Sequence, residues 1–367
     1  MQRLDNDYVK SGSYFAQVFT FRRTNRAWHL PPVAGLCVGV PLLLGLLVDD
    51  IEAGKLASVG ALVILYTQSN NLVNRMMILM ACGFGFIFSF TVGIVFSFSY
   101  WLSPLVLGVY TFGLHYALFK LDLNRPPGNF FFTMIASMAI SAPKDVAAIP
   151  TEIGHVSLGV MIACTIGLIY SLLTLKANER DETPALIHQN NYVNIVESII
   201  FGVTVGASLL VAKLLQMENP YWIPISCMAV MQGISVKHVW TRAIQRVLGT
   251  IIGLILVWGV LQFPMTVLGV CICILALQIV VEFLVVRNYA IAAVFITMLT
   301  IFLAEPNIAL TQQPGHLIQA RLLDTVIGSV IGALGGWMLY HERIHFYTKK
   351  HIRRSKILLK RMKSTIK

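Results

Sequence analysis

The stretch Asn219-Pro220-Tyr221-Trp222-Ile223-Pro224 decides how the second half of this chain is interpreted. It opens an apolar run that is too short for a simple membrane span, and Gln232 and the basic run Lys237, His238, Arg242 and Arg246 follow it. A span that cannot close its own backbone hydrogen bonds is tolerated at membrane depth only where protein or a water-filled cavity satisfies them. The stretch therefore predicts a pathway through a bilayer.

The composition agrees with a membrane environment. Of the 367 residues, 56% are apolar and 12% are charged, against about a quarter charged in a typical soluble domain. One soluble domain of this length could not hide so much apolar surface. The net charge of +11 is spread over many segments without interleaved aromatic residues, which argues against nucleic acid as a partner.

The apolar runs predict an all-α membrane protein of about twelve transmembrane helices in two tandem blocks of six. The runs of the first block are 31–48, 54–67, 75–98, 104–121, 129–141 and 153–176. Those of the second block are 195–215, 221–233, 247–262, 265–283, 289–304 and 322–341. The second run of each block is too short to be a simple span.

The distribution of Lys and Arg predicts the orientation. With the N-terminus inside, 24 of the 28 Lys and Arg residues fall in cytoplasmic segments, and only Lys55, Lys144, Lys213 and Arg321 fall outside them. We therefore expect both termini in the cytoplasm. The predicted regions are an N-terminal segment with an interfacial helix (1–28), the first repeat (29–176), a cytoplasmic linker (177–194), the second repeat (195–341) and a basic tail (342–367).

Local similarity between the blocks supports a repeat. Phe132-Thr133-Met134 resembles Ile296-Thr297-Met298, and a proline follows each threonine at a similar distance. Because each block has an even number of spans, both enter the membrane from the same side. The two blocks should therefore be related by a pseudo-two-fold axis along the membrane normal, with a path between them.

Three stretches of the second block resemble the fusaric acid resistance and aromatic acid exporter family. They are Pro220 to Pro224 with Gln232 and the run 242–253, Asn288-Tyr289-Ala290 leading to Phe295-Ile296-Thr297, and Arg321 to Thr325 with Gly328. The resemblance implies a bacterial inner-membrane permease for organic anions, often aromatic carboxylates. It implies no cofactor and no enzymatic activity. Many members carry sizeable cytoplasmic domains that are not found in this sequence.

The basic residues favour an anionic substrate on physical grounds as well. Lys237, Arg242 and Arg246 are expected at the cytoplasmic mouth of the broken span, where a basic funnel raises the local anion concentration. Moving one negative charge out of an inside-negative cell gains about 2.3 kcal/mol per 100 mV. The expected substrate path is formed by Tyr221, Trp222, Gln232, Lys237, Arg242, Arg246, Asn288 and Tyr289. Alternatively, the aromatic residues are interfacial and the arginines only anchor the topology.

Ionisable residues inside apolar runs are functional candidates because burying them is expensive. Asp324 follows Arg321 by one helical turn, so an ion pair and a proton-carrying role are both open. Glu282 is expected to be solvated or paired near the cytoplasmic surface. His115 could couple protons to transport, although a satisfied buried histidine is the simpler interpretation. Gly249 and Gly253 are expected to permit close helix contact.

Two other functional classes compete with the permease. His341-Glu342-Arg343-Ile344-His345 matches the HExxH pattern of zinc metalloproteases, but no acidic third ligand follows it and the tail is strongly basic. An envelope-assembly or scaffold protein is the other class. The partners considered are the bilayer, a small organic anion, a periplasmic adaptor and a second copy of the chain.

Overall fold

The structure is a computed structural model that describes residues 21, 24, 26–67, 71–121, 127–142, 145–174, 191–263, 265–304 and 314–341. The described residues form twelve α-helices and one 3-10 helix and include no strand, which confirms the all-α prediction. The predicted interfacial helix near the N-terminus, most of the predicted linker and the basic tail lie outside the described residues.

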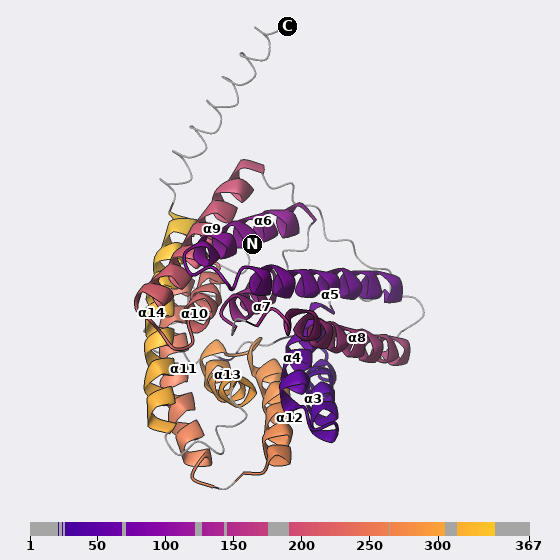
Figure 1. Ribbon diagram of the computed structural model, residues 1–367. Coiled ribbons are helices and arrows are strands. Elements are labelled where there is room, and N and C mark those ends of the chain that lie inside the picture. Colours follow the sequence, from indigo (N-terminus) through magenta and orange to yellow (C-terminus); the bar gives the residue numbers. More distant parts are fainter. Residues whose placement is uncertain are drawn as a thin grey trace, which may run out of the picture.

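The helices follow the order of the predicted runs (Figure 1). In the first half they are α3 (Leu30–Leu47), α4 (Ile51–Ala61), η1 (Leu62–Tyr66), α5 (Leu72–Val95), α6 (Leu102–Lys120), α7 (Phe130–Ile140) and α8 (Ile149–Thr174). In the second half they are α9 (Asn191–Leu214), α10 (Trp222–Met231), α11 (Val236–Val260), α12 (Val267–Leu284), α13 (Tyr289–Ala304) and α14 (Pro314–Tyr340).

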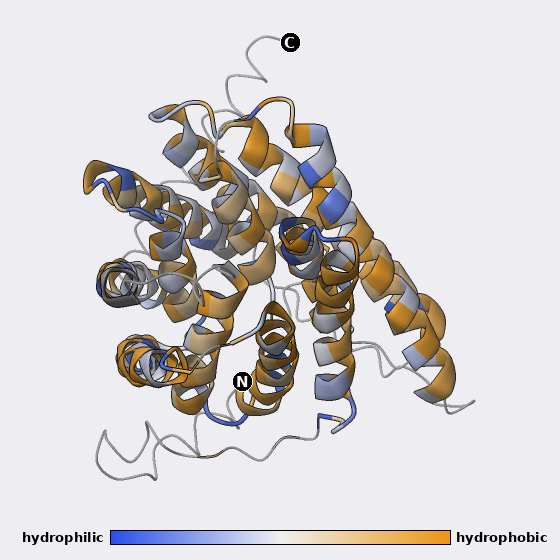
Figure 2. Cartoon of the chain, turned by 60° about the horizontal axis from the view of Figure 1, so that its bottom comes forward, coloured by the Kyte–Doolittle hydropathy of each residue, from blue (hydrophilic) through white to orange (hydrophobic). Residues whose placement is uncertain are grey.

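Eight of these helices are long and apolar enough to cross a membrane. The exceptions include α4 and α10, the second helix of each half, as the sequence predicted. The residues of the helices are predominantly hydrophobic (Figure 2). Large apolar side chains such as Phe84, Met161 and Leu173 are exposed. A surface of this kind fits lipid rather than water.

The short helix α10 is shaped by its prolines. It begins at Trp222, so Pro224 falls in the first turn, where a backbone N–H has no intrahelical partner and a proline is tolerated. Its ten residues span about 15 Å, half of the hydrocarbon thickness. The stretch Asn219 to Pro224 therefore starts a half-length helix rather than interrupting a longer one.

Two helices of the second half are longer than the sequence predicted. Helix α11 begins at Val236, where the Ser235 hydroxyl accepts a hydrogen bond from the His238 N–H at 3.2 Å, and not at Val247. Helix α14 begins at Pro314 rather than Leu322. Because the predicted runs stopped at charged residues, Arg242, Arg246 and Arg321 were placed beside spans although they lie within helices.

The two halves pack on each other mainly through two pairs of helices. Helix α6 of the first half lies along α9 of the second, and α12 of the second half lies along α3 of the first (Figure 1). Within the halves, α4 packs on α8 as α10 packs on α14, and α5 packs on α7 as α11 packs on α13. The short helix α10 also contacts α7 of the first half.

Candidate functional site

Helices α10, α11, α13 and α14 pack closely because glycines face their neighbours. A Cβ atom at Gly328 or Gly332 of α14 would lie 2.5 Å from a carbonyl oxygen of α10. On α11, a Cβ atom at Gly249 would lie 2.5 Å from the Ala293 side chain, and one at Gly253 would lie 2.6 Å from the Val294 carbonyl oxygen of α13. The expectation that Gly249 and Gly253 permit close helix contact is confirmed. These contacts bring three arginines together, Arg242, Arg246 and Arg321, which we call the arginine cluster.

Arg321 is held against an aromatic ring. It is 5% exposed, and its guanidinium carbon lies 3.2 Å from the centre of the Trp222 ring at the start of α10. Its Nη2 donates a hydrogen bond to the Thr300 hydroxyl of α13 at 3.2 Å. Within the described residues, Nε and Nη1 of Arg321 have no hydrogen-bond partner. The ring and the threonine thus fix the position of the side chain, while its Nε and Nη1 groups remain available to donate hydrogen bonds.

Arg246 occupies the middle of α11. It is 2% exposed, and its Nε has no hydrogen-bond partner in the part of the chain that the structure describes. It lies near enough to Arg321 for the two positive charges to act on each other. The sequence placed Arg246 at the start of a span, and the structure corrects this, because the capped start of α11 lies ten residues earlier.

Arg242 lies one turn before Arg246 on the same helix. Its Nε donates to the Ala229 carbonyl oxygen of α10 at 3.1 Å, and its guanidinium carbon lies 4.2 Å from the centre of the Tyr289 ring at the start of α13. It is also within electrostatic reach of Arg246. Like Arg321, it is therefore seated on an aromatic ring.

The arginine cluster forms a column along the helices. Arg242 contacts the end of α10 and the start of α13, whereas Arg321 contacts the start of α10 and the later part of α13. Arg246 lies between them, about 6 Å along the α11 axis from Arg242. All four helices belong to the second half, so the column lies inside that half and not between the two.

No carboxylate is paired with the arginine cluster within the described residues, where the ion pairs are Arg26–Glu282 and Lys55–Glu52. Asp324 is 1% exposed on α14, but its Oδ1 has no hydrogen-bond partner among those residues. For Asp324 the sequence leaves open an ion pair with Arg321 or a proton-carrying role, and the ion pair is not formed among the described residues. The long Arg321 side chain extends instead to Trp222 and Thr300 on the neighbouring helices.

Several predicted path residues lie at or beside the arginine cluster, and others do not. Trp222 and Tyr289 supply its rings, and Tyr221 packs on Trp222 with ring centres 4.7 Å apart. Asn288 is buried and caps α13 by accepting from the Ile291 N–H. Gln232 instead donates to the Pro127 carbonyl oxygen of the first half, and Lys237 is exposed at the start of α11.

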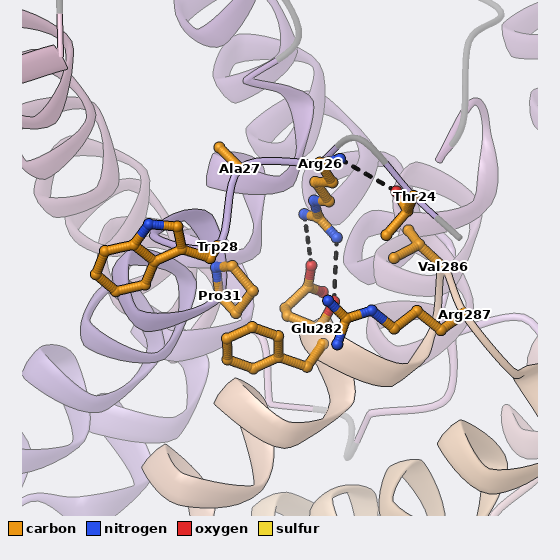
Figure 3. Close-up of a pocket in the computed structure, with 9 residues that line it drawn as sticks. Thr24, Arg26, Ala27, Trp28, Pro31, Glu282, Val286 and Arg287 are labelled. Atoms are coloured by element: carbon orange, nitrogen blue, oxygen red, sulfur yellow. Dashed lines mark hydrogen bonds and ion pairs between the residues drawn. The ribbon is translucent and has the colours of Figure 1, made fainter. Parts of the chain in front are cut away.

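Glu282 has a structural partner that sequence spacing did not indicate. It is buried at the end of α12 and forms an ion pair with Arg26 at 2.7 Å, and Arg26 also donates to its carbonyl oxygen (Figure 3). The segment before α3 is thereby attached to α12, beside a small hollow lined by Trp28 and Arg287. The solvated alternative is wrong, and the paired alternative is confirmed.

His115 behaves as a satisfied core residue. Its Nδ1 lies 2.9 Å from the Ser198 hydroxyl, and its ring stacks on Phe201 with centres 4.5 Å apart. Of the HExxH pattern, only His341 falls within the described residues. Those residues contain no group of three metal-binding side chains.

Two components of the site were not predicted. One is Thr300, whose hydroxyl accepts from Arg321, and the other is the carbonyl oxygen of Ala229. A threonine in an apolar run is a weak sequence signal, and a backbone carbonyl gives none. The buried hydroxyls of Ser226 and Ser329, unpartnered in the described part, add polar groups to α10 and α14.

These features define a multi-span helical membrane protein with a column of buried arginines in one half. Residues 205–335 match the family described as fusaric acid resistance protein-like. An uncharacterized membrane protein, YvaC of Bacillus subtilis (strain 168), is 37% identical over 156 residues, which are 42% of this chain and 24% of that relative. The match thus spans about a quarter of that relative's length, and no solved structure matches the chain. The second half of the chain is thus similar to the fusaric acid resistance protein-like family, which is the resemblance that its sequence predicted.

Proposed function

We propose that this chain is a membrane transporter that carries organic anions out of the cell, with aromatic carboxylates as the leading class. The path passes the arginine cluster between α10, α11, α13 and α14. The observation that carries the proposal is the burial of Arg246 and Arg321 with unused N–H donors and without a paired carboxylate in the described residues.

The cost of burial supports a binding role for these arginines. A charged side chain at the centre of a bilayer costs about 2.5–3.5 kcal/mol even on the lowest scales, and such residues normally face a partner or a water-filled cavity. The aromatic ring and single hydrogen bond of Arg321 offset only part of this cost. A carboxylate would complete the site, because guanidinium and carboxylate groups form strong charge-assisted hydrogen bonds.

The predicted orientation gives the column a direction. With both termini in the bacterial cytoplasm, Arg242 faces the inner end of the path and Arg321 the outer end. A lone anion that leaves an inside-negative cell along this path gains energy from the membrane potential.

The proposed two-fold relation of the halves is supported by their packing. The pair α6–α9 matches the pair α12–α3 when each helix is exchanged for its counterpart in the other half. The arginine cluster nevertheless draws its three arginines from one half. We therefore propose that the second half carries the path and that the first half supports it.

Efflux measurements test the proposal. Cells preloaded with labelled benzoate, succinate or acetate are compared at matched membrane levels for wild type, Arg246→Gln, Arg246→Lys and an empty vector. We expect Arg246→Gln to lower efflux of the transported class at least about tenfold, since it removes a buried charge–charge interaction. Arg246→Lys keeps the charge but loses the planar donor set, so it should retain part of the rate.

Arg287→Gln is the matched control. Arg287 is a basic residue just after the end of α12, where it lies over Phe283 and lines the hollow beside Arg26 and Glu282. Its substitution should leave efflux unchanged. Equal efflux by wild type and Arg246→Gln, with both proteins in the membrane, would refute the transport role and favour a scaffold.

A further inference from the structure

Asp324 is buried beside the arginine cluster without an evident structural task. It lies on α14 one turn before Gly328, whose added Cβ would meet the Ile223 carbonyl oxygen at 2.5 Å, so this face of α14 packs on the start of α10. A buried carboxylate that stabilises a fold is normally paired and hydrogen-bonded. Asp324 forms no ion pair with Arg321, and its Oδ1 accepts no hydrogen bond from the described residues.

The charges around Asp324 place it at one end of the column. Arg321 is the neighbouring charge on its own helix, and the exposed Glu218 acts on it from the segment before α10. On α11, the charge of Arg246 interacts with that of Arg321. On α9, Lys213 donates a hydrogen bond to the Ser103 hydroxyl of α6. Glu197, also on α9, interacts electrostatically with Tyr340 at the opposite end of α14.

A column of unopposed guanidinium groups would hold an anion too well. Charges attract strongly in a low-dielectric interior, so an anion between Arg246 and Arg321 would leave slowly. Transport requires binding that is favourable enough for entry and weak enough for departure. A fixed negative charge beside the site reduces the attraction.

We propose that Asp324 is the release residue of the anion site: its negative charge repels the anion bound at Arg321 and Arg246 and speeds its departure. This inference rests on the proposed function. It assigns Asp324 a role in affinity and turnover, in place of the structural ion pair that its spacing from Arg321 indicates.

Asp324→Asn separates this role from folding, because it removes the charge at nearly constant shape. The full chain is reconstituted into proteoliposomes, and initial rates of labelled benzoate transport are measured over a range of concentrations. We expect KM to fall about tenfold, because a like charge near the anion is removed, and the maximal rate to fall as well. Equilibrium binding of labelled benzoate to the same protein in nanodiscs should tighten by a similar factor. Asp324→Glu should stay near wild type in both measurements.

Asp49→Asn provides the control. Asp49 is an exposed acid between α3 and α4 with a φ of 57°, a conformation that asparagine also adopts. Its substitution should change neither KM nor the maximal rate. A damaged fold would weaken binding, so tighter binding cannot come from misfolding.

The outcomes separate this inference from the proposed function. Unchanged or weaker benzoate binding by Asp324→Asn, while wild type transports benzoate, overturns the role of Asp324 and leaves the transporter standing. If wild type neither binds nor transports benzoate, succinate or acetate, the proposed function fails and this inference fails with it.

Discussion

The position of the Arg321 side chain depends on one residue, Trp222. Its ring centre lies 3.2 Å from the guanidinium carbon, and the ring is itself buried at the start of α10. A cation–π contact of this kind contributes about 2 kcal/mol or more when water is excluded. Trp222 therefore connects α10 to α14. It also fixes the orientation of the Arg321 N–H groups that have no hydrogen-bond partner in the described residues.

Replacing this ring should affect both stability and transport. We expect Trp222→Ala to destabilise the protein by at least about 3 kcal/mol, because it adds the loss of buried aromatic volume to the loss of the cation–π contact. Benzoate efflux should fall with it. Trp222→Phe keeps a ring and should retain most of both. Stability is measured as the midpoint temperature at which half of the protein stays monodisperse after heating in detergent.

Trp240 supplies a comparison within the same half. It is 46% exposed on α11, and Trp240→Ala should lower the midpoint much less than Trp222→Ala. Equal midpoints for Trp222→Ala and Trp222→Phe would mean that the aromatic face is not what holds Arg321.

At the scale of helices, the sequence predicted well which helices exist and in what order, and it predicted the residues at which they begin less well. The short helices α4 and α10 were expected because their apolar runs are short. The starts of α11 and α14 were missed because a run-based boundary stops at the first arginine, whereas a buried arginine can lie inside a helix when neighbouring helices supply its contacts. The ring under Arg321 comes from another helix, and sequence spacing does not contain that information.

The contact between α11 and α13 depends on the absence of a side chain at Gly253. An added Cβ would lie 2.6 Å from the Val294 carbonyl oxygen and 2.8 Å from the Thr297 Cβ, so the two helices would have to separate. We expect Gly253→Ala to destabilise the protein by about 1–3 kcal/mol, the usual cost of overpacking. The heating assay again provides the measurement.

Gly259 is the control position on the same helix, since a Cβ there would meet no atom within 4 Å. Gly259→Ala should be neutral or stabilising by up to about 1 kcal/mol, because alanine loses less backbone entropy in a helix. If both substitutions behaved alike, helix propensity rather than close packing would explain the glycines.

On the scale of the whole molecule, contacts between distant segments determine what the sequence could not predict. Arg26 and Glu282 are 256 positions apart, and no local pattern links them. The anion hypothesis came from the sequence, since the basic run and the three family-like stretches are local. The location of the column within one half came from the packing of α10, α11, α13 and α14.

The packing between halves predicts that the chain can be divided and reassembled. At the α6–α9 contact, an added Cβ at Gly202 would lie 2.6 Å from the Gly108 carbonyl oxygen, so the backbones are close, and α12 lies along α3 at the second contact. Such interfaces hold membrane helices together by close packing. We expect fragments 1–190 and 191–367, produced together, to co-purify and to restore benzoate efflux, whereas neither fragment alone should do so.

Gly202→Leu in the second fragment tests whether this interface is responsible. The larger side chain would collide with Gly108 and with the Phe112 Cβ, which lies 2.8 Å from the added Cβ position. It should abolish co-purification while each fragment still enters the membrane. Co-purification that survives Gly202→Leu would assign the assembly to the α3–α12 contact, and fragments that never associate would show that the two halves need a continuous chain to meet.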